Sequence, residues 1–186
     1  MNLVLASKSP RRAWLLQSAG LSFRVVVAGV EETRRTGESP PEYALRLARE
    51  KRDAVVPMVP GAVVLAADTV VALGEDVLEK PRDAADAAVM LRRLSAVEHA
   101  VHTAVAAAGP AGAAHRVVTA RVRFRPLSDE DISRYVATGE PLDKAGAYGI
   151  QGDGGALVDE VHGSYTTVVG LPLREALELI AGARGP

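Results

Sequence analysis

Apolar and polar positions follow two periodicities along this chain, one typical of strands and one typical of helices. Short apolar runs, several rich in β-branched residues, predict strands. They cover residues 3–6, 23–28, 62–67, 70–73, 77–78, 97–108, 113–125 and 155–161. Apolar residues spaced by three and four predict helices. They cover residues 10–19, 40–55, 84–94, 129–138 and 171–181. We find no internal repeat, low-complexity segment or linker between these elements.

The first apolar run leads into a helix start rich in cations. Ser9 suits the N-cap and Pro10 the first helical position, while Lys8, Arg11 and Arg12 add positive charge. Free backbone N–H groups and the helix dipole favour anions at such a junction, phosphates above all. The stretch therefore predicts either a phosphate site or an ordinary strand–helix connection with solvated basic residues.

A carboxylate and two lysines form a second candidate group. Residues 62–67 read as a strand covered on both faces, and this strand is expected to end at Asp68 and Thr69, where α/β proteins commonly place catalytic carboxylates. A hairpin over residues 70–78 is expected to bring Lys80 back to the same region. Lys51 falls on or near the apolar face of its helix, so it either extends to water or points into a polar cleft.

Three further features bear on metal and ligand binding. The adjacent carboxylates Glu31 and Glu32 at a strand exit suit either a metal or a solvated loop. His99 and His102 lie three apart in one predicted strand and so on opposite faces, which argues against joint metal binding. Residues 139–152 are too rich in glycine for a helix and too polar for a buried strand, and a loop of that length is typically functional.

Composition excludes several classes of function. The 186 residues carry 22 Lys and Arg against 23 Asp and Glu, and the net charge of −1 disfavours nucleic-acid binding. The absence of cysteine excludes disulfides and thiolate chemistry. We also expect no signal peptide and no membrane span, and hence a cytoplasmic protein. Carboxylates beside lysines and arginines indicate phosphoryl chemistry, and no P-loop, Gly-x-Ser-x-Gly or dinucleotide-binding motif is present.

Several motifs, in order along nearly the whole chain, closely resemble the Maf family of nucleoside triphosphate pyrophosphatases. They are Ala6-Ser7-Lys8-Ser9-Pro10-Arg11-Arg12, Ala67-Asp68-Thr69-Val70-Val71, Glu79-Lys80-Pro81, Leu94-Ser95 with His99 and Thr103, Asp143-Lys144-Ala145-Gly146-Ala147-Tyr148-Gly149-Ile150-Gln151-Gly152, and Gly170-Leu171-Pro172. The resemblance implies one α/β domain over residues 1–186. Its fold would be a mixed twisted sheet with flanking helices, like that of the inosine triphosphate pyrophosphatases, with two lobes around a central cleft.

The resemblance also implies an activity and roles for individual residues. The activity is metal-dependent hydrolysis of a nucleoside triphosphate to its monophosphate and pyrophosphate, with Mg²⁺ or Mn²⁺. Asp68 matches the catalytic base and metal partner, and Glu32, or else Glu31, the acidic position beside the metal. Lys51 and Lys80 match the lysines that stabilise phosphates. The phosphate-binding turn is matched at Ser7, Arg11 and Arg12.

Arg11, Thr69 and Gln151 occupy the positions at which the family's branches differ, and they resemble the branch acting on dTTP, UTP and related pyrimidines. The Gln151 amide offers both a donor and an acceptor to a uracil or thymine edge. The implied role is house-cleaning, which keeps non-standard nucleotides out of nucleic acids. Two alternatives stay open, namely a 7-methyl-GTP or purine pyrophosphatase and a non-catalytic nucleotide or nucleic-acid binder affecting septum formation. A homodimer is a further possibility.

Overall fold

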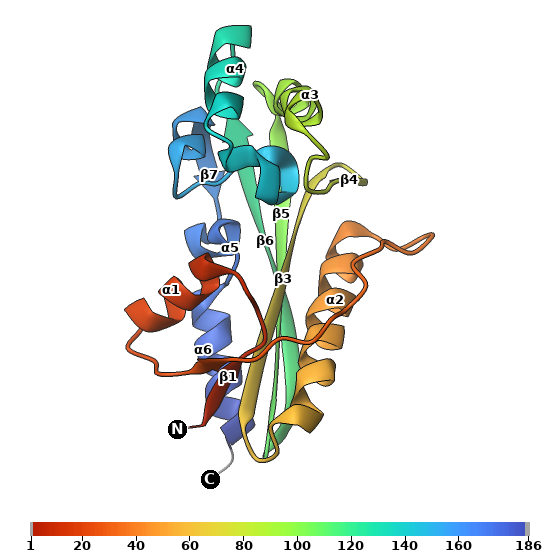
Figure 1. Ribbon diagram of the computed structural model, residues 1–186, viewed down its shortest axis with the longest axis vertical. Helices are drawn as coiled ribbons and strands as arrows, with labels where there is room; N and C mark the ends of the chain where they lie inside the picture. Colours follow the sequence, from red (N-terminus) through yellow and green to blue (C-terminus); the bar gives the residue numbers. More distant parts are fainter. Residues whose placement is uncertain (1, 185–186) are drawn as a thin grey trace. The chain divides into compact units, whose positions relative to one another are not determined.

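The computed structural model of this protein describes residues 2–184. Within that range one mixed sheet carries strands in the order β2-β1-β3-β5-β6-β7, and β4 pairs with β3 outside this path (Figure 1). The strands are β1 (Leu3–Leu5), β2 (Arg24–Val25), β3 (Val63–Leu73), β4 (Asp76–Leu78), β5 (Glu98–Gly109), β6 (Gly112–Phe124) and β7 (Val158–His162). The helices are α1 (Pro10–Ser18), α2 (Pro40–Val55), α3 (Ala84–Leu94), α4 (Asp129–Ala137), α5 (Tyr165–Val169) and α6 (Leu173–Arg184). The predicted mixed sheet with flanking helices is confirmed.

The sheet combines parallel and antiparallel pairs. β1 pairs in parallel with β2 and with β3, whereas β3 pairs antiparallel with β4, and β6 with β7. The predicted hairpin of β3 and β4 is confirmed, because Val71 lies opposite Leu78. β1 runs parallel to β3 and pairs only with its first part, because Leu5 lies opposite Leu65 and β3 continues to Leu73. The turn after β1 therefore lies close to the middle of β3.

Internal contacts divide the chain into two compact units. Of the described residues, the first unit comprises 2–69, 103–118 and 170–184, and the second comprises 70–102 and 119–169. Strands β3, β5 and β6 contribute residues to both units. The prediction of a single domain over residues 1–186, with a cleft between two lobes, stays a prediction.

The first unit packs helices on both faces of its strands. α2 lies on one side of β1 and β3, and α1 and α6 lie on the other (Figure 1). Side chains of a strand alternate between faces, so every second residue belongs to the α2 side. The buried cluster on that side consists of Val4, Ala6, Val55, Val59, Ala62, Val64 and Ala66. Val64 and Ala66 of β3 therefore face α2.

Sequence patterns locate the helix starts well. Pro10 begins α1 with Ser9 at the N-cap position, although the Ser9 side chain makes no capping hydrogen bond. The Ser39 N–H donates to the Glu42 carboxylate, 2.9 Å away, at the start of α2. Asp83 accepts from the Asp86 N–H at the start of α3. These contacts satisfy backbone donors that a helix start leaves unpaired.

The second unit has its own core. Residues from strands, from α3 and α4 and from the loop after α4 form it: Val71, Leu78, Ala87, Leu91, Leu94, Val101, Val122, Phe124, Ile132, Tyr135, Ala147, Tyr148 and Leu157. The predicted loop over residues 139–152 holds two short 3₁₀ segments, Glu140–Asp143 and Ala145–Ala147, and no strand. Burial of Ala147 and Tyr148 in the core shows why this long loop is ordered.

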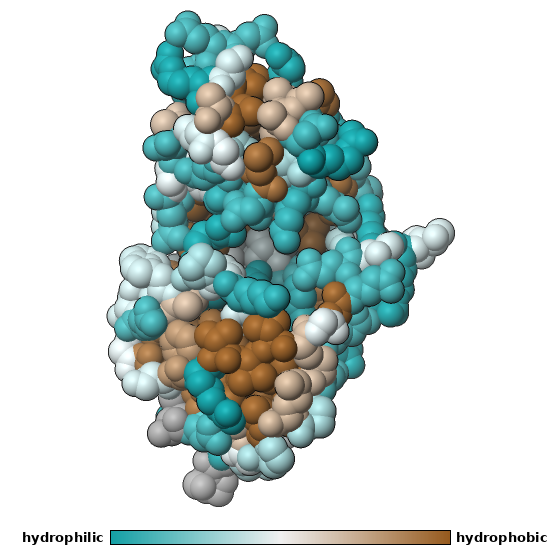
Figure 2. Space-filling view, in the orientation of Figure 1, coloured by the Kyte–Doolittle hydropathy of each residue, from teal (hydrophilic) through white to brown (hydrophobic). Residues whose placement is uncertain are grey.

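Two strand predictions are wrong in extent. Strand β3 does not end at Asp68 and Thr69 but continues to Leu73, because these polar side chains find partners within the fold. The strand predicted over 23–28 shrinks to β2, since the short β1 offers it few hydrogen-bonding positions. Figure 2 shows an apolar area where β1 and the chain after β2 lie in Figure 1. In agreement, Val25 and Val27 are exposed.

Smaller errors concern the last third of the chain. The strand predicted over 155–161 begins later, at Val158, after a 3₁₀ segment. Helix α5 begins at Tyr165, soon after the end of β7 at His162. In α6 Ile180 is buried, whereas Leu177 is 37% exposed and does not face the core. Among the described residues, we find no helix with the length and apolar character that crossing a membrane requires.

Candidate active site

One ammonium group joins two carboxylates in the first unit. The Lys51 Nζ on α2 lies 2.6 Å from Asp68 Oδ1 and 2.5 Å from Glu32 Oε1. The side chains of Lys51 and Asp68 are 16% and 10% exposed, whereas that of Glu32 is 47% exposed. Of the two orientations open from the sequence, Lys51 therefore adopts the one directed at polar partners.

The buried carboxylate of Asp68 has a perturbed pKa. Burial raises the pKa of this carboxyl above its ordinary value, and the positive charges of Lys51 and Arg12 oppose that rise. A carboxylate whose pKa moves towards neutrality is a better proton acceptor than an exposed one, provided that it is ionised. Asp68 thus has the environment that a general base needs.

Arg12 organises the turn after β1. Its Nε donates to the Gly170 carbonyl (2.7 Å), its Nη1 to Ser7 Oγ (2.9 Å) and its Nη2 to Thr69 Oγ1 (3.1 Å). Thr69 Oγ1 lies 3.0 Å from Thr103 Oγ1, which extends the network to β5. An arginine has five N–H donors, so two remain beyond these three bonds. Arg12 therefore has a structural role and retains donors for an anion.

Successive residues of β3 serve the two sides of the first unit. Asp68 points to Lys51 on α2, and Thr69 points to Arg12 on α1. This division follows from the strand period of two, which sends neighbouring side chains to opposite faces. Asp68 and Thr69 are neighbours in the middle of β3. They thus connect the cluster of Lys51 and Asp68 on one face of the strand with Arg12 in the turn after β1 on the other face.

The remaining residues of the predicted phosphate turn differ in exposure. Ser7 is buried, and its Oγ also accepts from the Ser9 N–H at 3.3 Å. Arg11 is half-buried and Lys8 is exposed. Since Ser7 holds both the backbone of the turn and the Arg12 guanidinium, it fixes the entry to α1. Phosphate binding by this turn stays a prediction.

The two adjacent glutamates have different partners. Glu32 reaches Lys51, whereas Glu31 is exposed and its Oε1 accepts from Thr33 Oγ1 at 3.1 Å. Glu32 is therefore the one that shares a cation with Asp68. Within the described residues, no group of three or more acidic or histidine side chains could hold a metal ion. Two carboxylates suffice for Mg²⁺ where substrate phosphates complete its coordination, so this donor pair fits a metal that binds together with a nucleotide.

Lys80 and Gln151 belong to the second unit, and both are exposed. Lys80 follows β4, and Gln151 lies on the loop after α4. Glu140 holds that loop together, because its carboxylate accepts from the Tyr135 hydroxyl (2.9 Å) and from the Asp153 N–H (3.0 Å). The predicted approach of Lys80 to Asp68 and the predicted role of Gln151 in base recognition stay predictions.

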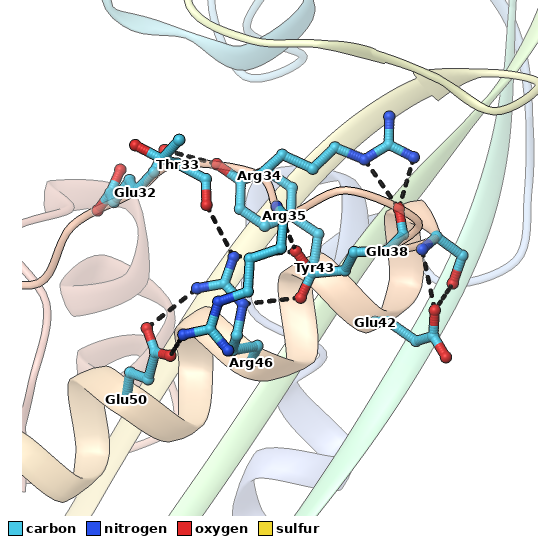
Figure 3. A network of polar contacts seen from close by, with 10 residues as sticks. Glu32, Thr33, Arg34, Arg35, Glu38, Glu42, Tyr43, Arg46 and Glu50 are labelled. Carbon is cyan, nitrogen blue, oxygen red and sulfur yellow. Dashed lines mark hydrogen bonds and ion pairs between the residues drawn. The ribbon is translucent and has the colours of Figure 1, made fainter.

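Sequence reasoning did not single out Tyr43 and Arg46 of α2. The Tyr43 hydroxyl donates to the Glu32 carbonyl, and Arg46 donates to the Thr33 carbonyl, so both hold the segment that carries Glu32 (Figure 3). Tyr43 occupies a position that periodicity assigns to packing, and Arg46 resembles any polar helix residue. Tyr43 precedes Lys51 by two steps of four residues, through Leu47, and this spacing is the one sign of such a role in the sequence, whereas Arg46 carries none.

A sequence profile of the family described as Maf-like protein matches residues 2–183. The chain belongs to the Maf family. A curated protein of Salmonella typhimurium named dTTP/UTP pyrophosphatase is 57% identical over 180 residues, which cover 96% of this chain and 91% of that protein. A protein of the same name from Escherichia coli O157:H7 is 54% identical over 181 residues, with coverages of 97% and 92%.

The chain is also similar to a solved structure at low sequence identity. A HAM1 protein from Coxiella burnetii matches with a TM-score of 0.47 and 17% identity, covering 96% of this chain and 99% of that one. The profile and the curated relatives span nearly all of the chain, including both compact units. The family resemblance drawn from motifs alone is confirmed.

Proposed function

We propose that this Maf chain hydrolyses dTTP and UTP to the nucleoside monophosphate and pyrophosphate. The observation that carries the proposal is 57% identity, over 96% of the chain, to a protein named dTTP/UTP pyrophosphatase. The cluster of Asp68, Glu32 and Lys51 supports it, because a buried carboxylate next to a cation suits the activation of water beside a phosphate. The same reaction would accept related non-standard pyrimidine nucleotides, consistent with a house-cleaning role.

In the proposed reaction a water molecule attacks the α-phosphorus and the α–β phosphoanhydride bond breaks. Asp68 accepts a proton from the water, and the water oxygen becomes part of the monophosphate. Pyrophosphate leaves with the bonding electron pair. Lys51 and the free N–H groups of Arg12 stabilise the negative charge that develops on the phosphate oxygens, an electrostatic contribution that is commonly the largest in such reactions. Lys80 is assigned the same role on the leaving phosphates.

A divalent cation, Mg²⁺ or Mn²⁺, is part of this proposal. Asp68 and Glu32 would hold it, and it would neutralise phosphate charge and orient the nucleotide. Lys51 lies between the same two carboxylates, so its positive charge holds them close together when no nucleotide is bound. Gln151 is assigned to the base, because an amide complements a uracil or thymine edge.

Pyrophosphate release tests the proposal directly. We expect turnover of dTTP and UTP with Mg²⁺ or Mn²⁺, and much weaker turnover of CTP, ATP, GTP and 7-methyl-GTP. In ¹⁸O-labelled water the label should enter the monophosphate. Preferred turnover of 7-methyl-GTP or of a purine would favour the alternative branch, and binding without turnover would favour the non-catalytic alternative. Label in pyrophosphate, or release of inorganic phosphate, would contradict attack at the α-phosphorus.

The assignment of Asp68 has its own test. Asp68→Asn keeps the size of the side chain but cannot accept the proton, so turnover of dTTP should fall by at least about 100-fold. Asp129→Asn is the matched control, because Asp129 is 81% exposed and its ion pair with Arg92 lies at the surface, so the protein should tolerate the change. Near-normal turnover of Asp68→Asn with metal present would show that Asp68 is not the base.

A further inference from the structure

The segment that carries Glu32 has no regular secondary structure of its own. Between the end of β2 at Val25 and the start of α2 at Pro40, the chain forms neither helix nor strand. Backbone hydrogen bonds of a helix or sheet therefore do not fix the position of Glu32. Its carboxylate nevertheless lies 2.5 Å from the Lys51 Nζ, so other contacts must hold the segment.

Tyr43 makes one of these contacts on the Glu32 residue itself. The Tyr43 hydroxyl donates to the Glu32 carbonyl oxygen at 2.7 Å, and the tyrosine is only 4% exposed. A buried aromatic ring has little freedom to move, so its hydroxyl is a fixed point on α2. The backbone of Glu32 is thereby tied to the helix that also carries Lys51.

Arg46 makes further contacts with the same segment, after Glu32 in the chain. Its Nη2 donates to the Thr33 carbonyl at 2.9 Å, directly after Glu32 in the chain. Its Nε and Nη2 also donate to the two carboxylate oxygens of Glu38, at 2.7 and 2.9 Å. Figure 3 shows the Arg46 guanidinium between the segment and the helix, with Glu50 accepting from its third nitrogen.

Burial makes the Arg46–Glu38 pair stronger than an ordinary surface ion pair. The two side chains are 13% and 11% exposed, and the geometry is bidentate. The hydrogen bond from Arg46 is the main reason that the pKa of Glu38 lies below its ordinary value. Glu38 therefore stays ionised at neutral pH and keeps its two hydrogen bonds to Arg46.

We propose that Tyr43 and Arg46 are positioning residues that hold Glu32 at Lys51 beside Asp68. One helix carries the lysine and both anchors, with Tyr43, Leu47 and Lys51 spaced by four along the same side. The relation between the Glu32 carboxylate and the Lys51 ammonium is thus set within a single rigid element. This inference rests on the proposed function, in which Glu32 helps to hold the metal bound with the nucleotide.

Mn²⁺ binding measured without turnover tests the inference. Binding is followed by electron paramagnetic resonance in the presence of α,β-methylene-UTP, which cannot be hydrolysed at the α–β bond. Arg46→Gln should weaken Mn²⁺ binding about tenfold, the loss typical when a residue that orients a metal ligand is removed. Tyr43→Phe removes a single hydroxyl and should weaken it about fivefold. Wild-type Mn²⁺ binding in both variants would overturn the proposal.

A double-mutant cycle with Glu32 separates positioning from general stability. In a Glu32→Gln background, Arg46→Gln should cause no further loss of Mn²⁺ binding, because its effect passes through Glu32. The same additional loss in both backgrounds would show that Arg46 only stabilises the fold. Tyr43→Phe gives the same cycle with a smaller change and keeps the test informative if an Arg46 variant unfolds.

Matched controls use exposed residues of the same types. Arg49→Gln alters another arginine of α2, and Tyr165→Phe removes an exposed tyrosine hydroxyl on α5, so both should bind Mn²⁺ like the wild type. Loss of Mn²⁺ binding in either control would contradict the specificity of the effect. Pyrophosphate release by the wild type is measured separately, so failure of the proposed function is distinguishable from failure of the positioning role.

Discussion

At the scale of single residues, the site depends on groups with more than one partner. Arg12 ties the turn after β1 to Thr69 and Gly170, and Lys51 ties Glu32 to Asp68. Each is a cation held by neutral or negative groups already present in the protein. Their removal therefore changes both geometry and the charge of neighbouring groups, which makes the pH dependence of turnover informative.

Replacing Lys51 should shift the acid side of the pH profile. Burial already raises the pKa of Asp68, and the Lys51 charge opposes that rise. Lys51→Met should raise the pKa further, so the ionised base appears, and kcat/KM rises, at higher pH than in the wild type. The rate at the optimum should also fall about 100-fold.

Lys51→Arg is the companion variant for this prediction. It keeps the positive charge beside Asp68. The pH at which kcat/KM rises on the acid side of the profile should therefore stay near its wild-type value even if the rate falls. If kcat/KM of Lys51→Met rose at the same pH as that of the wild type, protonation of Asp68 would not be what limits turnover at low pH.

Changing Gln151 should alter the choice of base. An ionised glutamate can only accept hydrogen bonds, whereas the amide both donates and accepts. Gln151→Glu should therefore lower kcat/KM for dTTP and UTP by about 100-fold relative to 7-methyl-GTP. Gln17→Glu, the same change at an exposed position of α1, should leave the ratio unchanged. Equal ratios in Gln151→Glu and the wild type would remove Gln151 from base recognition.

At the scale of elements, irregular segments bear much of the predicted chemistry, and regular elements hold them in place. α2 anchors the Glu32 segment, and α4 anchors the loop of Gln151 through Tyr135. The Tyr135 hydroxyl donates to Glu140 and accepts from the Gly149 N–H at 3.0 Å. Each loop thus has a buried tyrosine from a helix as its fixed point.

Gly152 packs closely against the carboxylate of Glu140. A Cβ there would lie 2.6 Å from Glu140 Oε1, and the same carboxylate accepts from the Asp153 N–H. Gly152→Ala should destabilise the protein by about 1–3 kcal/mol and raise the KM for dTTP, because Gln151 is adjacent. Urea denaturation and steady-state kinetics measure both effects.

Gly182→Ala in α6 is the control for that change, since a Cβ there meets nothing within 4 Å among the described atoms. It should leave stability unchanged or raise it by up to about 1 kcal/mol. A Gly152→Ala protein as stable as the wild type would show that Glu140 moves without cost.

At the scale of the whole molecule, one buried histidine links folding to pH. His99 is 2% exposed, lies edge-on to Phe124 and Tyr148, and has its Nε2 2.9 Å from the Tyr148 hydroxyl. Burial lowers the pKa of His99 to about 4, from an ordinary value of 6.5. The unfolded chain therefore binds a proton between these values that the folded chain does not.

The free energy of unfolding should accordingly fall as pH decreases from about 6.5 to about 4, with a contribution from His99 of up to about 3 kcal/mol. Above pH 6.5 this contribution is fully present. His99→Gln keeps a partner for Tyr148 but cannot titrate, so its stability should vary less over the same window. Denaturation at several pH values measures the difference, and parallel curves for both proteins would contradict a buried neutral His99.

Much of the fold could be predicted from the sequence because it rests on local patterns. Proline and capping residues locate the starts of α1, α2 and α3, and apolar periodicity finds the long strands β5 and β6. The extent of β2 and β3 could not be predicted in this way. Pairing with a short neighbour limits β2, and internal partners allow the polar Asp68 and Thr69 to sit in mid-strand.

The sequence by itself determined which chemical groups this Maf chain possesses, and it pointed to Asp68, Lys51 and Arg12 through their residue types and motifs. Only the tertiary structure decided which of these groups contact one another. It placed Asp68 and Thr69 on opposite faces of β3, selected Glu32 over Glu31 as the partner of Lys51, and assigned Tyr43 and Arg46 to the Glu32 segment. The physical reason is that these contacts join residues distant along the chain, and such pairings depend on packing and on the alternation of a strand, not on local propensity.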